Sequence, residues 1–236
     1  MKERKNFFGP VEKALFDFNL IEKGDRILVG ASGGKDSTAL IEFFSQLQKR
    51  PSFQFEFKAV HIKSDFAPPF PKKIQSLFEK WKVPFEIREV NTLGRVKEGY
   101  KMSCWWCSNQ RRKELILYAV EHGYNKIALG HHLDDVLETF LMNMTKKGEL
   151  STMIPKLKLD KYPVEIIRPL YYMTENSLIE HAKKTEYAGF TCTCNYQLNS
   201  TRKEAKSLIN IISKGNDKTK ELMIKALKNI KHNYLP

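Results

Sequence analysis

The residues with the clearest potential for chemistry form the segment 31–37, whose sequence is Ala-Ser-Gly-Gly-Lys-Asp-Ser. This segment follows an apolar run at residues 27–29 and precedes a helical pattern that begins at Thr38. Two glycines let the backbone approach an anion, the N–H groups at the start of a helix point toward it, and Lys35 adds a full positive charge. The segment therefore predicts a phosphate-binding turn between a buried strand and a helix.

The spacing of this turn differs from that of a Walker A loop. A Walker A loop needs a glycine five positions before the glycine of its Gly-Lys pair, and a serine or threonine directly after the lysine. Here Val29 and Asp36 occupy those two positions. The turn therefore indicates another class of phosphate site, and an ordinary glycine turn between strand and helix is the alternative.

A second group of chemically capable residues lies at 130–135, with the sequence Gly-His-His-Leu-Asp-Asp. It follows an expected strand and opens an expected helix, and ligands of open α/β sheets bind beyond the carboxyl ends of the strands. Two carboxylates at a helix N-terminus are stabilised by its dipole and can hold Mg²⁺ against a triphosphate. We therefore expect Asp134 and Asp135 to bind Mg²⁺, with a simple helix cap as the alternative. His131 and His132 are expected to form hydrogen bonds or to stack on an adenine.

The four cysteines form two pairs, Cys104 with Cys107 and Cys192 with Cys194. Two thiolates at positions i and i+3 can bind one metal centre, and the distant pair adds one or two soft ligands that suit zinc or an iron–sulfur cluster. Spacing alone favours structural zinc, and the Trp-Trp dipeptide between the first pair speaks against a redox motif. Because cysteines at i and i+2 tend to point apart, we expect one of the second pair to be the principal ligand.

Composition and charge indicate the kind of partner. The 236 residues include 40 Lys and Arg against 27 Asp and Glu, a formal net charge of +13. Basic residues gather at 95–113 and 201–236, which predicts a polyanionic partner, with nucleic acid as the first candidate. No apolar run approaches the ~20 residues of a membrane span, and the first residues lack the apolar stretch of a signal peptide. We therefore expect a cytoplasmic protein in which the cysteines are ligands or nucleophiles rather than disulfides.

The elements that must position these residues follow from the hydrophobic pattern. We expect a short N-terminal helix that ends at residues 20–25, and then strands that alternate with helices, which is typical of a doubly wound, mostly parallel α/β sheet. The pattern places the first cysteine pair in a loop before a helix, and capping signals at Thr201 and Asn216 precede two basic C-terminal helices. The expected strands are 27–30, 53–62, 85–90, 126–130 and 164–168, and the expected helices are 38–48, 72–81, 109–122, 134–144, 202–213 and 217–229. The expected segments are 1–24, an α/β domain at 25–190, and a helical extension at 191–236.

The motifs, in this order, resemble those of a known enzyme family. Ser-Gly-Gly-Lys-Asp-Ser resembles the PP-loop of the ATP pyrophosphatases, whose fold is of the adenine nucleotide α-hydrolase type. The whole set is most similar to that of the tRNA 2-thiocytidine synthetases. The resemblance covers about residues 27–206 and rests on Cys-x-x-Cys at 104–107, the basic run 111–113, the segments 126–135 and 167–170, and a cysteine ahead of Gln197 and Arg202.

This resemblance implies an ATP-dependent tRNA sulfurtransferase. Enzymes of this family split ATP at the α-phosphorus, adenylate a tRNA base carbonyl and replace its oxygen by sulfur. Many hold a [4Fe–4S] cluster on three cysteines, so that one iron is free to carry sulfide; here the ligands would be Cys104, Cys107 and Cys194. The implied cofactors and partners are ATP, Mg²⁺, the cluster, tRNA and a sulfur donor, either a cysteine desulfurase or sulfide, and a homodimer is the assembly considered.

The resemblance also assigns roles to single residues. Asp135 is the expected essential carboxylate, supported by Asp134 and assisted by Arg111, and Asp36 is a further expected catalytic residue. Ile62 and Gly130 are expected to flank the adenine. Lys206, Lys214 and Lys220 are expected to bind tRNA phosphates. The expected nucleotide-binding turn consists of Ala31, Ser32, Gly33, Gly34, Lys35, Asp36 and Ser37.

The second cysteine pair departs from the family pattern, which is usually Cys-x-x-Cys at this place. Thr191 stands at the first of those positions and Cys192 is extra, whereas counting back from Gln197 and Arg202 favours Cys194. Whether Cys192 is a ligand stays open at this point. The alternatives are a PP-loop ligase similar to the tRNA lysidine synthetases, a zinc-stapled RNA-binding protein with a vestigial nucleotide site, and sulfur transfer to a small molecule. The sequence does not specify which tRNA base is modified.

Overall fold

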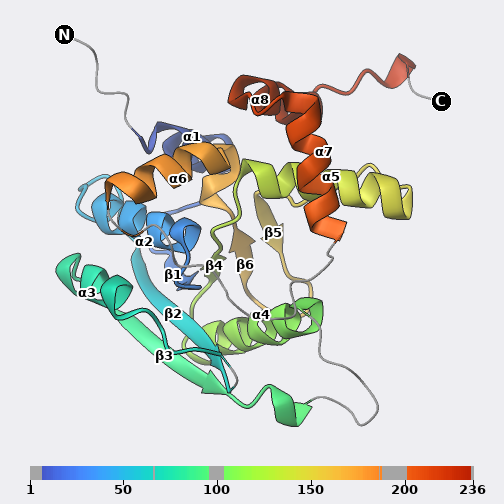
Figure 1. Cartoon of the computed structure of the whole chain (residues 1–236). Helices are drawn as coiled ribbons and strands as arrows, with labels where there is room; N and C mark the ends of the chain where they lie inside the picture. Colours follow the sequence, from blue (N-terminus) through green and yellow to red (C-terminus); the bar gives the residue numbers. More distant parts are fainter. Residues whose placement is uncertain (1–6, 66, 96–103, 186, 188–200, 235–236) are drawn as a thin grey trace.

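The computed structural model describes residues 7–65, 67–95, 104–185, 187 and 201–234. Its centre is a six-stranded sheet in the order β3-β2-β1-β4-β6-β5. All neighbouring strands are parallel except β5, which pairs with β6 in the antiparallel sense (Figure 1). The strands are β1 Arg26–Gly30, β2 Glu56–Ser64, β3 Phe85–Val90, β4 Lys126–Ala128, β5 Lys156–Lys158 and β6 Glu165–Ile167.

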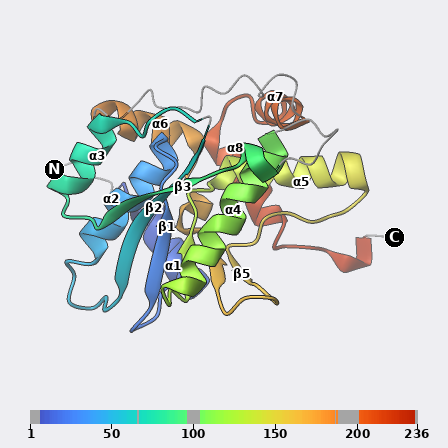
Figure 2. The ribbon, with the colours of Figure 1, turned by 90° about the horizontal axis from the view of Figure 1, so that it is seen from below.

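Helices cover both faces of the sheet, unequally. In Figure 1, α4 lies on one side of the sheet, whereas α1, α2 and α6 lie on the other. Helices α7 and α8 pack against α5 at one end of the molecule (Figure 2). The helices are α1 Gly9–Asp17, α2 Lys35–Leu47, α3 Lys72–Lys80, α4 Cys104–Glu121, α5 Leu133–Lys147, α6 Glu175–Lys184, α7 Thr201–Ser213 and α8 Asp217–Ala226, with 3₁₀ turns η1 Leu93–Arg95, η2 Pro169–Tyr172 and η4 His232–Tyr234. Among the described residues, no helix is both long enough and apolar enough to cross a membrane.

Strand β1 is apolar because it is buried on both faces. Ile27 and Val29 belong to the large core that includes residues of α2 and α6, and Leu28 belongs to the smaller core beneath α4. All three side chains are fully buried. A parallel strand that is covered on both sides appears in the sequence as a continuous apolar run rather than as an alternating one, which explains why this strand could be predicted.

Gly130 brings the end of β4 into direct contact with the start of α2. A Cβ atom at this position would lie 3.0 Å from the backbone nitrogen of Ser37 and 3.1 Å from the carbonyl carbon of Asp36. Backbone atoms in the first turn of a packed helix cannot move aside easily. The residue is therefore glycine because the two segments that carry the phosphate-binding turn and the acidic pair pack backbone against backbone.

The expected doubly wound parallel sheet with a helical C-terminal extension is confirmed. The cap at Asn216 is also confirmed, since its side chain accepts from the N–H groups of Lys218 and Thr219. Several boundaries were wrong. Helix α1 ends at Asp17, β2 begins three residues later than expected, and β5 and α6 were not predicted at all. Helix α4 begins at Cys104 rather than residue 109, so Cys107 lies in a helix and not in a loop.

We expect Gly130→Ala to lower the free energy of unfolding by about 1–3 kcal/mol, because the added methyl group is forced into the α2 backbone. Urea denaturation followed by circular dichroism measures this. The matched control is Gly9→Ala, since a Cβ at Gly9 has no neighbour within 4 Å. Equal stability of the two variants would contradict the close packing at Gly130.

Candidate functional site

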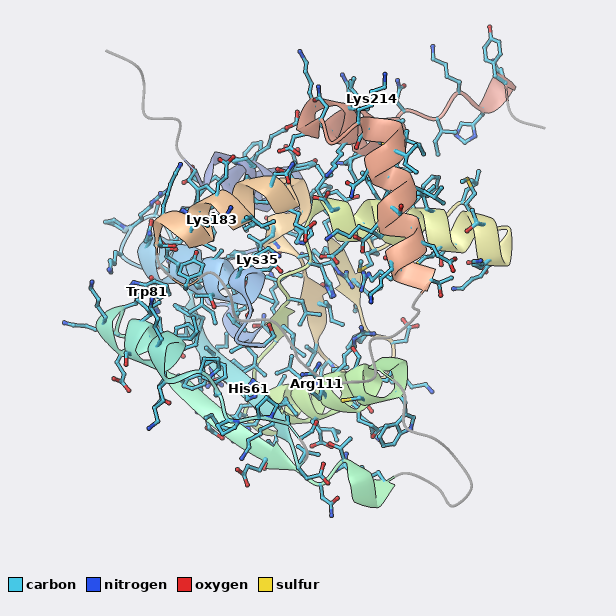
Figure 3. All side chains as sticks on the ribbon, viewed as in Figure 1. Lys35, His61, Trp81, Arg111, Lys183 and Lys214 are labelled. Carbon is cyan, nitrogen blue, oxygen red and sulfur yellow. The ribbon has the colours of Figure 1, made fainter. Side chains whose placement is uncertain are left out.

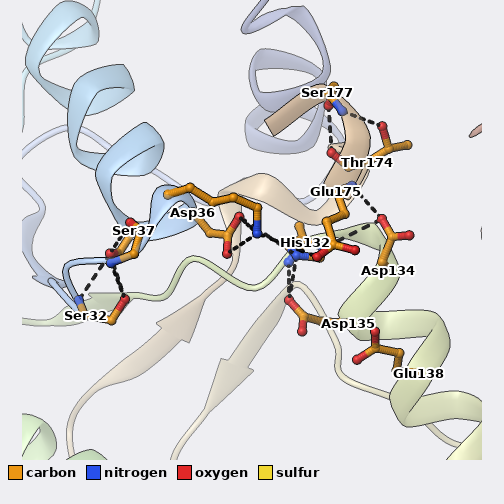
Figure 4. Close-up of polar contacts among 12 residues, drawn as sticks. Ser32, Asp36, Ser37, His132, Asp134, Asp135, Glu138, Thr174, Glu175 and Ser177 are labelled. Atoms are coloured by element: carbon orange, nitrogen blue, oxygen red, sulfur yellow. Dashed lines mark hydrogen bonds and ion pairs between the residues drawn. The ribbon is translucent and has the colours of Figure 1, made fainter. Parts of the chain in front are cut away.

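The turn between β1 and α2 is closed by its own serines. The hydroxyl groups of Ser32 and Ser37 lie 2.9 Å apart, the Ser32 N–H donates to Ser37 Oγ at 3.2 Å, and the Gly34 N–H points to Ser32 Oγ at 3.3 Å (Figure 4). Gly33 has a φ of +82° and packs against Phe70 and Pro71, so a side chain there would be strained. These bonds fix a glycine-rich turn at the N-terminus of α2, which is the arrangement of a phosphate site.

Lys35 lies among carboxylates. Its Nζ is 3.1 Å from Asp36 Oδ1 and 3.7 Å from Glu175 Oε1. Glu175 is the first residue of α6, whose N-cap Thr174 accepts from the Ser177 N–H. Glu175 was not among the predicted site residues, although Thr174, a favoured N-cap residue, could have indicated the start of this helix.

A pocket of about 310 Å³ opens at the carboxyl ends of the central strands. The space is within the range of small-ligand sites, and it combines apolar walls with charged groups. Figure 3 shows Arg111 and His61 beside each other at this edge of the sheet, with Lys35 nearby. The lining residues are Gly30, Ala31, Ser32, Asp36, Ser37, Val60, His61, Ile62, Ser108, Arg111, Arg112, Leu115, Leu129, Gly130, His131 and Asp135.

Most of the predicted site residues therefore meet in one place. Ala31, Ser32, Asp36 and Ser37 contribute from the turn, whereas Gly33, Gly34 and Lys35 form the rest of the turn without lining the pocket. The structure brings the other predicted lining residues to the same pocket from three further elements: Ile62 from β2, Arg111 from α4, and Gly130 and Asp135 from the β4–α5 junction.

His61 is a pocket residue that the sequence analysis did not single out. Its Nδ1 lies 2.7 Å from the carbonyl oxygen of Ala31, so Nδ1 carries the proton and donates. Burial, together with the charges of Arg111 and Lys63, lowers the pKa of His61. The ring is therefore neutral near pH 7, with Nε2 as a hydrogen-bond acceptor.

Arginine side chains make one wall of the site electropositive. Arg111 and Arg112 line the pocket, and the Nε of Arg111 is buried and has no hydrogen-bond partner among the described residues. Arg168 does not line the pocket, and its Nη1 donates to the carbonyl oxygen of Ile154. Burial lowers the pKa of Arg168 to about 10, so this residue stays charged at neutral pH. Burial also lowers the pKa of His131 to about 4, which leaves that imidazole neutral. The buried Nε of Arg111, in a pocket that also contains part of the phosphate-binding turn, is suited to an anion.

Asp135 both caps α5 and faces the pocket. Its Oδ2 accepts the backbone N–H of His132 at 3.0 Å, and its Oδ1 lies 3.3 Å from Arg202 Nη2. Burial opposes ionisation of Asp135, but His132, His131 and Arg202 outweigh it and lower the pKa of this carboxyl. Asp135 is therefore ionised and accessible from the pocket, as a catalytic or Mg²⁺-binding carboxylate must be.

Asp134 has a different environment from the one expected. It is buried, its Oδ1 is 2.6 Å from Lys220 Nζ, and its Oδ2 accepts the Glu175 N–H at 2.6 Å (Figure 4). Both oxygens thus have protein donors, and Asp134 does not line the pocket. The described residues contain no group of three or more Asp, Glu, His or Cys side chains arranged to hold a metal. The pocket carboxylates that remain for Mg²⁺ are Asp36 and Asp135.

The three lysines predicted to bind tRNA differ in their exposure and in their ion-pair partners. Lys220 is wrong for this role, because it is only 3% exposed and pairs with Asp134. Lys206 is partly exposed and pairs with Glu175 at 2.7 Å. Lys214 lies exposed just after α7 and keeps the role as a prediction.

The first cysteine pair lies next to the pocket. Cys107 is partly exposed in the first turn of α4, and its Sγ is 3.9 Å from the hydroxyl of Ser64 at the end of β2. The following residues Ser108 and Arg111 line the pocket. Cys104 is the first residue of α4. The side chain of Cys104, and all of Cys192 and Cys194, lie outside the described residues.

A closed glycine turn at the edge of a doubly wound sheet, facing arginines and an acidic helix start, defines a nucleotide-binding α/β protein of the PP-loop class. The chain matches the PP-loop domain family over residues 5–210. It is 35% identical over 229 residues to the tRNA-cytidine(32) 2-sulfurtransferase of Coxiella burnetii (strain RSA 493 / Nine Mile phase I), covering 95% of this chain and 90% of that one. It is 40% identical over 240 residues to the enzyme of the same name from Nitrosomonas europaea, covering 99% and 76%. The chain therefore belongs to the PP-loop family, in the group that includes these relatives.

Solved structures show the same fold. The U34-tRNA thiolase NcsA from Methanococcus maripaludis, solved with its [4Fe-4S] cluster, superimposes with a TM-score of 0.76 at 22% identity, covering 96% of this chain and 80% of that one. The NH3-dependent NAD synthetase from Campylobacter jejuni superimposes with a TM-score of 0.51 at 11% identity, covering 97% and 91%. At such identities the likeness concerns the fold alone.

We expect Lys220→Met to lower the free energy of unfolding by about 3–5 kcal/mol, because it leaves the buried Asp134 carboxylate without its cation. Chemical denaturation measures this value. The control Lys225→Met removes an exposed lysine from the same helix and should change stability by less than about 0.5 kcal/mol. The double variant Asp134→Asn/Lys220→Met should recover part of the loss, and a Lys220→Met protein as stable as the Lys225→Met control would refute the pairing.

Proposed function

We propose that this protein is an ATP-dependent tRNA sulfurtransferase that converts a cytidine to 2-thiocytidine, with cytidine 32 as the target. The convergence of three features on one pocket carries the proposal: the phosphate turn closed by Ser32 and Ser37, the unpartnered Nε of Arg111, and the helix that begins with Cys-x-x-Cys. The names of the curated relatives support the substrate and the position.

The proposed reaction has two bond exchanges. The O2 oxygen of cytidine attacks the α-phosphorus of ATP, the bond to the bridging oxygen breaks, and pyrophosphate leaves. Hydrosulfide then adds to C2, and AMP leaves with the former O2 oxygen, so that a C2=S bond forms while the sulfur proton passes to pyrophosphate or solvent. Cytidine, ATP and hydrosulfide thus give 2-thiocytidine, AMP and pyrophosphate.

The residues of the pocket have distinct tasks in this reaction. The turn at 31–37 and Lys35 would hold the β- and γ-phosphates, and Ile62 and Gly130 would flank the adenine. Asp36 and Asp135 would hold Mg²⁺ against the phosphates, since both are pocket carboxylates. Arg111 would offset the negative charge that develops at the α-phosphorus, because its buried Nε lacks a partner.

The cysteines fit an iron–sulfur cluster in their chemistry. Soft thiolate ligands suit such a cluster, and the partly exposed Cys107 lies in the helix turn that borders the pocket. We propose Cys104, Cys107 and Cys194 as the ligands. When bound, a [4Fe–4S] cluster with three protein thiolates offers one iron to which exogenous sulfide can coordinate.

We also propose a domain organisation, a sulfur donor, a compartment and an assembly for this protein. The PP-loop domain would comprise residues 25–190, between an N-terminal helical segment at 1–24 and the basic extension at 191–236. The sulfur donor would be sulfide or a cysteine desulfurase, the protein would act in the cytoplasm, and a homodimer is the proposed assembly. A ligase of the lysidine-synthetase type and a structural zinc site have less support, because the relatives from Coxiella burnetii and Polaromonas are named as sulfurtransferases.

We expect the anaerobically reconstituted protein, supplied with ATP, Mg²⁺, sulfide and unmodified tRNA, to form 2-thiocytidine, which mass spectrometry of digested nucleosides detects. Lys35→Ala should abolish the product, and Asp135→Asn should lower kcat by roughly 10²-fold or more if this carboxylate acts electrostatically in the transition state. Lys225→Met, which is far from the pocket lining, should be unchanged. ATP cleavage without any thionucleoside would overturn the assignment.

We expect anaerobic purification to give a brown protein with about four irons per chain, as a [4Fe–4S] cluster requires. Cys107→Ala and Cys194→Ala should lose the visible absorption and the iron, whereas Cys192→Ala should keep both. Metal analysis and electron paramagnetic resonance of the reduced protein provide the measurement. Stoichiometric zinc without iron, or loss of metal from Cys192→Ala alone, would instead support a structural metal site.

A further inference from the structure

Glu175 lies between two lysines that come from opposite ends of the chain. One is Lys35 of the phosphate-binding turn, whose Nζ is 3.7 Å from Glu175 Oε1. The other is Lys206 of α7, whose Nζ is 2.8 Å from Oε1 and 2.7 Å from Oε2. Lys206 thus contacts both carboxylate oxygens of Glu175, whereas Lys35 lies near one of them at a longer distance.

The backbone of Glu175 is held in place independently of its side chain. Its N–H donates to Asp134 Oδ2 at 2.6 Å, and Asp134 is in turn paired with the buried Lys220. The start of α6 is therefore held at Asp134 by contacts that do not involve Lys206, and the Glu175 carboxylate can still reach Lys35 when Lys206 is absent. Figure 4 shows Glu175 between Asp134 and the region of Asp36.

Glu175 and Lys206 each stabilise the charged form of the other. Burial alone would raise the pKa of Glu175, but the hydrogen bond and charge of Lys206, with the charge of Lys35, lower it. Burial would lower the pKa of Lys206, and Glu175 reverses this. Both groups are ionised near neutral pH, so a carboxylate that loses Lys206 has Lys35 as its nearest remaining cation.

Carboxylates compete with nucleotide phosphates for the ammonium group of Lys35, so a stronger carboxylate contact weakens phosphate binding. Asp36 follows Lys35 directly in the first turn of α2, whereas Glu175 belongs to another helix and acts as a competing anion. We propose that Lys206 is a positioning residue for ATP binding: by neutralising Glu175, it keeps that carboxylate from capturing Lys35, which remains available to the β- and γ-phosphates.

This inference rests on the proposed ATP site, and it differs from a direct role of Lys206 in binding phosphates. If Lys206 attracted ATP by its own charge, its removal would weaken ATP binding by the same factor with or without the Glu175 carboxylate. A lysine that acts by neutralising Glu175 is dispensable once Glu175 is uncharged. The two roles therefore separate in a double-mutant cycle.

The test measures nucleotide affinity of the full-length protein by isothermal titration calorimetry, with Mg²⁺ and without tRNA. Lys206→Met should weaken ATP binding by roughly tenfold, the size of a coupled charge interaction. Glu175→Gln/Lys206→Met should return to within about threefold of the original protein, as should Glu175→Gln alone. AMP, which lacks the pyrophosphate that Lys35 would hold, should bind all four proteins alike, whereas a damaged fold would weaken both nucleotides.

The matched control is Lys203→Met, which removes an equal charge from the exposed surface of the same helix and should leave ATP affinity unchanged. If Lys206→Met binds ATP as the original protein does, or if the double variant stays as weak as Lys206→Met, the inference is wrong while the ATP site stands. If the original protein binds no ATP at all, the proposed function itself fails.

Discussion

The whole candidate site depends on the point at which the strand order of the sheet reverses. From β1 the chain crosses to β2 on one side, whereas β4 pairs with the other edge of β1 and leads on to β6. Segments that leave β1 and β4 at their carboxyl ends therefore diverge and leave a crevice between them, as in other open α/β sheets. Gly130 lets the β4 segment touch the first turn of α2, which sets how closely the phosphate turn and Asp135 approach.

Charge balance is the second constraint on this edge, and the C-terminal helices supply much of it. Asp134 is neutralised by Lys220 of α8, Glu175 by Lys206 of α7, and Asp135 and Glu138 by Arg202 of α7. Carboxylates so close together would repel one another and raise their own pKa values without these cations. Helices α7 and α8 are therefore part of the site, in addition to presenting basic surface.

The parts of the site that could be predicted from the sequence are contiguous. The turn at 31–37 and the 130–135 segment each combine a strand end, a glycine and a helix start within a few residues, so their local chemistry indicates their position. Glu175, His61 and the buried role of Lys220 could not be predicted, because each depends on a partner far away in the chain. Lys220 is the clearest example. In the sequence, this lysine of a basic, amphipathic helix looks like its solvent-exposed neighbours, because its burial depends on pairing with the distant Asp134. Strand β5 was missed for a related reason, since its three residues have no apolar period and form a strand only by pairing with β6.

The pairing of Asp134 with Lys220 also has a consequence for the order of folding. The phosphate turn is made of residues near the N-terminus, yet the neighbouring carboxylates of Asp134 and Glu175 pair with lysines of α8 and α7. Because a chain emerges from the ribosome N-terminus first, the sheet and its turn can assemble while these carboxylates still lack their cations. The charge balance at this edge of the sheet is then completed at the last step, when α7 and α8 dock on α5.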